Sequence, residues 1–166
     1  MQNKLTKLFI ILVISIQLIF ILGTVYSNEK KLKSAKEIIV KLAPLDPRSI
    51  MQGDYVVLDY DISRAAQKAI KKKTLKKIKV VLSPQNNLYV FDSILSPTQN
   101  IILKKDQVVM NGKITKRNRV HFGIENFFVE EGTGLEIERK AKFATLKVTS
   151  KGDAFITKLL EKVPEN

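Results

Sequence analysis

The chain opens with a long apolar run that differs from everything after it. No charged residue lies between Leu8 and Ser27, and isoleucine and leucine dominate this stretch. At about 1.5 Å per residue, ~20 apolar residues cross the ~30 Å hydrocarbon core of a bilayer, and such a span is helical because lipid offers its backbone no hydrogen bonds. We therefore predict that residues 1–27 form a single N-terminal transmembrane helix, a membrane anchor that contacts the lipid bilayer through residues 8–27.

A cleaved signal peptide is the alternative interpretation of this run. Val25 and Ser27 are small enough to precede a cleavage site. The A-x-A pattern is missing, however, and the run exceeds the usual ~7–15 apolar residues of a signal peptide. These features favour an anchor that is retained.

The charges beside the run bear on its orientation. Lys4 and Lys7 precede it, whereas four lysines follow between residues 28 and 36, and a count of charges alone keeps the domain in the cytoplasm. A short leader before one apolar run is nevertheless the usual start of an export signal, and long domains cross membranes largely regardless of charge. We expect a single-pass protein of the cell membrane whose domain is extracytoplasmic.

After a polar, lysine-rich tether at residues 28–36, the hydrophobic pattern becomes short and alternating. Alternation over about four to eight residues, bounded by turn residues, is typical of half-buried strands. The pattern predicts strands at residues 37–42, 55–62, 78–82, 88–95, 108–114, 119–122, 143–150 and 154–160. Segments rich in turn residues link three expected hairpins, at residues 83–87, 116–118 and 151–153.

Two helical segments interrupt these strands. Ser63 is a suitable N-cap for a helix at residues 64–73, and a second helical stretch is expected at residues 135–142. Together these elements predict a mainly β domain over residues 37–166. Its fold is expected to be an antiparallel small barrel or sandwich with one or two short helices.

Composition excludes several kinds of chemistry. The chain has 166 residues with no cysteine and one histidine, which rules out disulfides, thiolate metal sites, cysteine nucleophiles and histidine-rich metal sites. We expect no cofactor, no metal and no catalytic residue. The one histidine, His121, lies among apolar neighbours and is interpreted as a half-buried structural residue.

Two stretches carry a resemblance to a known family. The first fits the pattern G-D-Y-x-x-L-x-Y at every fixed position, with Gly53, Asp54, Tyr55, Leu58 and Tyr60. The second is the block at residues 122–132, which contains Glu125, Glu131 and Gly132 and precedes an Ile-Glu pair at residues 137–138. On these residues the chain resembles the GDYXXLXY family, bacterial membrane-anchored proteins of unknown function with one extracytoplasmic domain. The resemblance implies no activity, and it suggests a multi-pass membrane protein as a partner.

The first motif admits a structural and a binding interpretation. Alternate residues of the expected strand 55–62 share an inner face, formed by Val56, Leu58, Tyr60 and Ile62. The other face carries Tyr55, Asp59 and Asp61, and these could form a binding edge. Asp59 and Asp61 would lie roughly 7 Å apart, a spacing compatible with acid–base work or a hard cation. A structural role, with the two aspartates as solvated counter-charges, is the favoured interpretation.

The most unusual feature of the expected domain is a block rich in positive charge. Between residues 64 and 79 every second position on average is basic and none is acidic: Arg64, Lys68, Lys71, Lys72, Lys73, Lys76, Lys77 and Lys79. A solvated face is the first interpretation, because the whole chain has 29 Lys+Arg against 16 Asp+Glu. Contact with anionic lipid headgroups is the second. Nucleic acid is not expected as a partner, because an exported protein rarely meets it.

These patterns predict a membrane-anchored, non-enzymatic accessory or interaction domain that acts with another membrane protein. Two alternatives remain open. One is an uncharacterised hydrolase that uses Asp54, Asp59 or His121, although no nucleophile elbow accompanies these residues. The other is a basic domain that binds anionic lipid.

Overall fold

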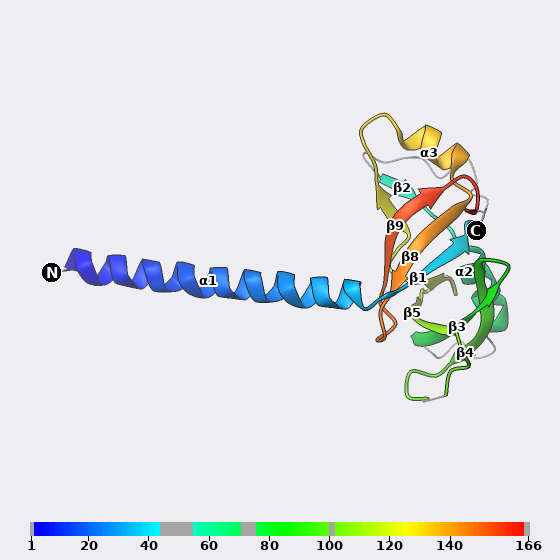
Figure 1. The fold of residues 1–166 in the computed structure, drawn as a ribbon, viewed down its shortest axis with the longest axis horizontal. Coiled ribbons are helices and arrows are strands. Elements are labelled where there is room, and N and C mark those ends of the chain that lie inside the picture. Colours follow the sequence, from blue (N-terminus) through cyan, green and yellow to red (C-terminus); the bar gives the residue numbers. More distant parts are fainter. Residues whose placement is uncertain (1, 44–54, 71–75, 100–101, 165–166) are drawn as a thin grey trace. The chain divides into compact units, whose positions relative to one another are not determined.

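A computed structural model describes residues 2–43, 55–70, 76–99 and 102–164 (Figure 1). The chain divides into two compact units, Met1–Ser34 and Ala35–Asn166. Within the described residues there are three helices and nine strands. The N-terminal unit is one helix, and the second unit holds all the strands.

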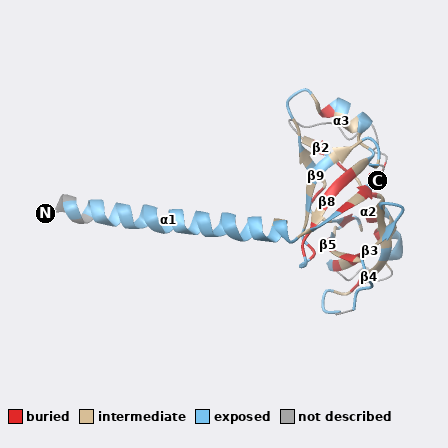
Figure 2. Ribbon diagram, viewed as in Figure 1, coloured by how far each residue is buried: buried red, intermediate tan, exposed pale blue. Residues whose placement is uncertain are grey.

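Helix α1 (Gln2–Lys33) includes the apolar run and continues beyond it. Its large apolar side chains from Leu8 to Tyr26 are exposed, and Thr6–Lys33 is long and apolar enough to cross a membrane (Figure 2). The hydroxyls of Ser15 and Thr24 donate to the carbonyls four residues earlier, each at 2.8 Å, so these polar groups need no water. Most of the expected tether is helical as well, since α1 ends only at Lys33.

Two antiparallel sheets form most of the domain. Strands β1 (Lys36–Lys41), β8 (Phe143–Val148) and β9 (Ala154–Leu160) form a sheet in the order β1-β8-β9. Strands β3 (Lys77–Gln85), β4 (Leu88–Leu95), β5 (Val108–Ile114) and β6 (Val120–His121) form a second in the order β4-β3-β5-β6. Strand β1 also contacts β4, which brings the two sheets together.

The remaining elements are short. Strands β2 (Tyr55–Val57) and β7 (Asn126–Phe128) pair with each other, helix α2 (Asp61–Ala69) contacts β1, β4 and β6, and helix α3 (Gly134–Lys140) contacts β2. The mainly β fold with short helices, preceded by a long apolar helix, is therefore as predicted. Its shared core includes Ile38, Val40, Tyr60, Ile62, Ala66, Val80, Leu82, Met110 and Leu146.

The prediction of a strand at residues 55–62 is correct for residues 55–57 and wrong for residues 58–62. Strand β2 ends at Val57, Tyr60 makes an isolated bridge to Leu42, and α2 begins at Asp61. An acidic residue in the first turn suits the positive end of the helix dipole. The inner face was nevertheless identified correctly, because Val56, Leu58, Tyr60 and Ile62 are all buried.

Ser63 is not the N-cap that the pattern predicts. It lies in the first turn of α2, is buried, and its hydroxyl donates to the Val120 carbonyl at 2.9 Å. The N-cap position belongs to Tyr60, and the helix therefore starts three residues earlier than expected. A tertiary hydrogen bond has taken the hydroxyl that would otherwise cap the helix.

The link expected at residues 83–87 is also shorter in the structure. Strand β3 continues through Pro84 to Gln85, and only Asn86 and Asn87 turn the chain into β4. Both asparagines have positive φ angles, 46° and 64°, as a two-residue type I′ turn requires. The other two hairpin links lie where the pattern predicts them.

Candidate functional site

The family-like motif is mostly part of the core. Leu58 is 3% exposed and Tyr60 is fully buried, whereas Tyr55 is half-buried and packs edge-on against Phe128, with ring centroids 6.4 Å apart. Gly53 and Asp54, the other two motif positions, lie outside the described residues. The alternation places Tyr55 and Tyr60 on opposite faces, and in the structure these two rings do not form one aromatic platform.

The motif holds the second distinctive block of the sequence. The Tyr60 hydroxyl donates to the Ile124 carbonyl at 2.6 Å, and the Leu58 amide donates to the Glu125 carbonyl, also at 2.6 Å. Strand β2 adds the pairing of Val56 with Phe127. Burial, followed by the nearby charge of Glu125, raises the pKa of Tyr60 well above its usual range, so its hydroxyl stays a donor. The two motif blocks, far apart in sequence, are one packed unit.

Glu125 and Gly132 shape turns in this second block. The Glu125 carboxylate accepts hydrogen bonds from the amides of Phe122 and Gly123, and Gly123 has a φ of +83°. Gly132 has a φ of +81° in the turn before α3, and its neighbour Glu131 is exposed. Glu125 thus closes a loop through its carboxylate, and Gly132 permits a left-handed turn, so these two residues have local structural roles.

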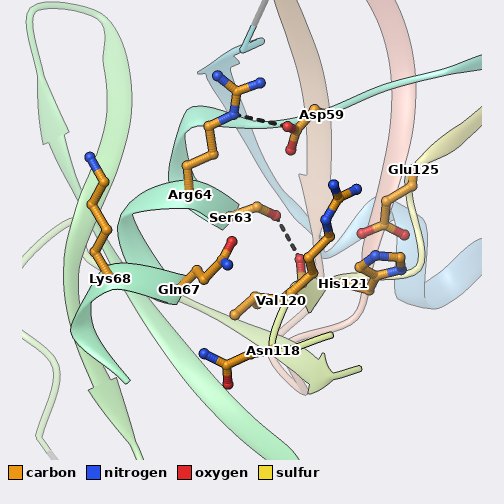
Figure 3. A pocket seen from close by; sticks show the side chains of 10 residues that line it. Asp59, Ser63, Arg64, Gln67, Lys68, Asn118, Val120, His121 and Glu125 are labelled. Atoms are coloured by element: carbon orange, nitrogen blue, oxygen red, sulfur yellow. Dashed lines mark hydrogen bonds and ion pairs between the residues drawn. The ribbon is translucent and has the colours of Figure 1, made fainter. Parts of the chain in front are cut away.

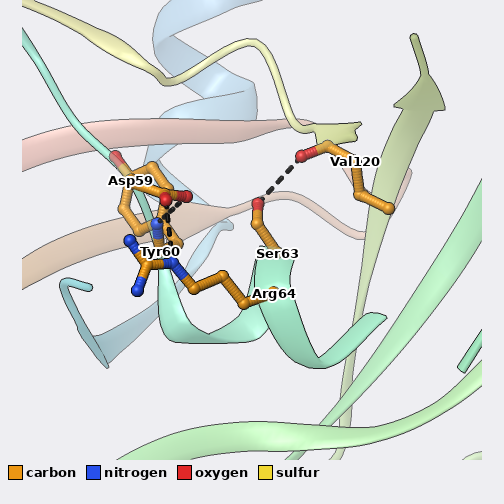
Figure 4. A network of polar contacts seen from close by, with 5 residues as sticks. All are labelled: Asp59, Tyr60, Ser63, Arg64 and Val120. Atoms are coloured by element: carbon orange, nitrogen blue, oxygen red, sulfur yellow. Dashed lines mark hydrogen bonds and ion pairs between the residues drawn. The ribbon is translucent and has the colours of Figure 1, made fainter. Parts of the chain in front are cut away.

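Asp59 and Asp61 do not share a face, contrary to the sequence interpretation. Asp59 accepts hydrogen bonds from Arg64 Nε and from the Tyr60 amide, each at 2.9 Å (Figure 4). A carboxylate oxygen of Asp61 lies 3.7 Å from Lys41 Nζ instead. The chain changes from strand to helix between them, which destroys the two-residue period. No paired-carboxylate centre is formed.

A cleft of about 550 Å³ lies between α2 and the segment that contains β6 (Figure 3). From α2 it is lined by Ser63, Arg64, Gln67 and Lys68, and from the opposite side by Asn118, Arg119, Val120, His121 and Glu125, with Asp59 at the start of the helix. His121 is exposed rather than half-buried, so its sequence interpretation is wrong. The cleft gathers polar groups and offers no apolar chamber.

The acidic side chains that line this cleft have hydrogen-bond partners, whereas two of its basic side chains have no acidic partner among the described residues. Both of its acids already have partners, because Asp59 binds Arg64 and Glu125 binds two backbone amides. Lys68 and Arg119 are exposed and make no ion pair with any described residue. The arrangement can therefore attract an anion, and Arg119 is a candidate residue that the sequence interpretation missed.

The basic block does not form one helical face. Arg64 and Lys68 lie on α2, Lys77 and Lys79 lie on β3 and Lys76 immediately precedes it, while Lys71, Lys72 and Lys73 lie outside the described residues. Lys77 is directly opposite Lys113 of β5, which is in turn opposite His121 of β6. Lys113 was missed because its sequence neighbours give no hint of this register.

Metal-ligand clusters do not mark the described part of this region. The described residues contain no group of three His, Cys, Asp or Glu side chains that could hold a metal ion. Among these residues every buried side-chain polar atom has a hydrogen-bond partner. The region is accordingly described best as a polar surface with excess positive charge.

Comparison with curated proteins and with solved structures found no match to this chain. A family model described as GDYXXLXY protein matches residues 17–159, from the middle of α1 to strand β9. This match covers both motif blocks that pack together around Tyr60 and most of the chain. The chain therefore belongs to the GDYXXLXY family.

Proposed function

We propose that this protein is a membrane-anchored accessory domain, extracytoplasmic and non-enzymatic, that acts through another membrane protein. The observation that carries the proposal is α1, in which an uncharged stretch of helix exposes its apolar side chains and is followed along the chain by a separate compact β unit. Apolar side chains exposed in such number are stable in lipid and not in water. Lipid contact through residues 8–27 then keeps the domain at the membrane surface.

The use of the motif residues supports a binding role over catalysis. Leu58 and Tyr60 are buried in the core. The carboxylate of Asp59 binds Arg64, and that of Glu125 accepts hydrogen bonds from backbone amides. A general base or nucleophile needs a free, positioned polar group beside its reaction partner. These carboxylates do not fit that requirement.

Exposed apolar side chains near β2 supply a candidate partner surface. Phe128 on β7 is 79% exposed and Leu135 on α3 is 58% exposed. Strand β2 pairs with β7 and contacts α3, so the two side chains belong to one region of the domain. Large aromatic and aliphatic anchors of this kind dominate the binding energy of protein interfaces.

Cross-linking in intact membranes, followed by mass spectrometry, tests the proposal. We expect a stoichiometric adduct with one membrane protein, and we expect the Phe128→Ser/Leu135→Ser double variant to lose it. Phe155→Ser is the matched control. Phe155 is 44% exposed on β9, in the β1-β8-β9 sheet rather than the β2-β7 pair, and its substitution should not affect the adduct. Adducts with phospholipid alone, or with many unrelated proteins equally, would contradict the proposal.

A further inference from the structure

The exposed face of the four-stranded sheet carries two opposed lysines with a histidine beside them. Lys77, Lys113 and His121 occupy directly opposite positions on β3, β5 and β6, and all three are exposed. Like charges directly opposite each other on neighbouring strands destabilise a sheet, because strands lie only ~4.8 Å apart. The repulsion between Lys77 and Lys113 is lowered when an anion binds between them, so this pair points to an anionic ligand.

Two hollows adjoin at these side chains. The cleft beside α2 and a second one of about 660 Å³ share His121 and Glu125 as lining residues. The second hollow is lined in addition by Lys77, Lys79 and Lys113. Each has the size of a small-molecule site, and the two adjoin at β6; the second is lined by apolar side chains, such as Ile78 and Phe122, as well as by its lysines.

Positive charge on this surface is not neutralised within the described part of the chain. None of Lys68, Lys77, Lys79, Lys113 and Arg119 forms an ion pair there. The three acids that line the two hollows already accept hydrogen bonds: Asp59 from Arg64, Glu125 from the amides of Phe122 and Gly123, and Asp153 from Asn111. Asp59 is paired with Arg64, so five cations remain against the two carboxylates of Glu125 and Asp153, and none of the five is within ion-pair distance of a described acid.

We propose that this surface, the β6 anion site, binds a phosphate-bearing ligand of the size of a lipid headgroup. A phosphate group offers several acceptor oxygens to neighbouring lysines. A phosphate monoester carries up to two negative charges, whereas a carboxylate and the phosphodiester of a phospholipid each carry one. The ligand removes the repulsion between the opposed Lys77 and Lys113 when it binds. This proposal goes beyond the accessory role above and does not depend on a protein partner.

Calorimetric titration of the full chain in a non-ionic detergent tests the site, with glycerol 3-phosphate as the probe and acetate as the comparison anion. We expect saturable binding of glycerol 3-phosphate with a dissociation constant of ~1 mM or lower, and binding of acetate about tenfold weaker or absent. Equal affinity for the two anions, or no binding of glycerol 3-phosphate, would overturn the proposal.

Variants separate the site from general attraction to a basic protein. Lys113→Gln/Arg119→Gln should weaken glycerol 3-phosphate binding by about tenfold or more. The matched control, Lys158→Gln/Lys162→Gln, removes the same charge at exposed positions outside both hollows and should change binding less than about twofold. Thermal unfolding of both variants checks that they fold. Equal losses in the two would overturn the site.

A footprint distinguishes a lipid headgroup from a soluble phosphate compound. The full chain is placed in phosphatidylcholine nanodiscs with or without phosphatidylglycerol, and lysine acetylation is read by mass spectrometry. A lipid source predicts that phosphatidylglycerol protects Lys77 and Lys113 more than Lys158. A soluble source predicts protection of these two lysines by glycerol 3-phosphate and not by the lipid. Protection of neither lysine by either compound would overturn the proposal.

Discussion

At the scale of single residues, Tyr60 explains why the family motif ends in tyrosine. Its ring is fully buried among side chains of both sheets, and its hydroxyl reaches the Ile124 carbonyl. A phenylalanine would fill the same space but would leave that carbonyl without its donor. The residue therefore joins packing and a specific hydrogen bond in one side chain.

Truncation of Tyr60 should cost much more stability than removal of its hydroxyl. We expect Tyr60→Ala to lower the free energy of unfolding by about 3–5 kcal/mol through the cavity it leaves. Tyr60→Phe should lower it by about 1–2 kcal/mol through the unpaired carbonyl. Urea denaturation of residues 35–166 measures both, and a Tyr60→Ala variant as stable as its parent would show that the ring is not a core residue.

The raised pKa of Tyr60 also predicts how stability depends on alkaline pH. The folded protein keeps this phenol protonated, because burial and then the charge of Glu125 oppose its ionisation, whereas the unfolded chain ionises near pH ~10. The stabilising contribution is thus complete below about pH 10 and falls as pH rises above it. Tyr60→Phe should reduce the slope of unfolding free energy against pH there, by up to ~1.4 kcal/mol per pH unit. An unchanged slope would contradict the burial argument.

At the scale of elements, the hydrophobic pattern was most informative where one face of a strand is buried. It identified the positions of β1 and β5 and the buried side of residues 56–62, where burial repeats every second residue. The boundary of α2 was predicted wrongly because a residue far along the chain determines it: the Ser63 hydroxyl, the expected N-cap, donates to the Val120 carbonyl instead. The row of Lys77, Lys113 and His121 was invisible for the same reason, since it depends on strand register.

The turn between β3 and β4 offers a test of one such boundary. Asn87 has a φ of 64°, a left-handed conformation that glycine adopts more easily than any other residue. We expect Asn87→Gly to stabilise the domain by about 0.5 kcal/mol and Asn87→Ala to destabilise it by about 1 kcal/mol. Thermal unfolding measures both, with Gln85→Ala in the extended part of the hairpin as a neutral control. A stabilising Asn87→Ala would show that the turn is not of this type.

Helix α1 should hold the chain in membranes against alkaline carbonate. Ile16→Arg/Ile19→Arg places two charges in the apolar run, each costing ~2.5–3.5 kcal/mol at the bilayer centre, and should release the protein into the supernatant. Asn28→Arg, near the polar end of α1, is the control that should stay in the pellet. A wild-type protein recovered in the soluble fraction with a new N-terminus near residue 28 would indicate a cleaved signal peptide instead.

At the scale of the whole molecule, the connection between the apolar helix and the β domain is short. Helix α1 ends at Lys33 and β1 begins at Lys36, so only two residues of the chain separate these elements. The chain carries a formal net charge of +13. Under the proposed anchoring, this basic chain would meet a high local concentration of anionic headgroups and of other membrane proteins. Which of these it meets depends on the side of the membrane it faces.

Cysteine labelling in intact cells measures that side directly, because the natural chain contains no cysteine. Lys158→Cys places a thiol at an exposed position of β9, and Asn3→Cys places one before the apolar run. We predict that a membrane-impermeant maleimide labels Lys158→Cys in intact spheroplasts and labels Asn3→Cys only after lysis. Labelling in the opposite order would place the β domain in the cytoplasm and contradict the proposed extracytoplasmic accessory role.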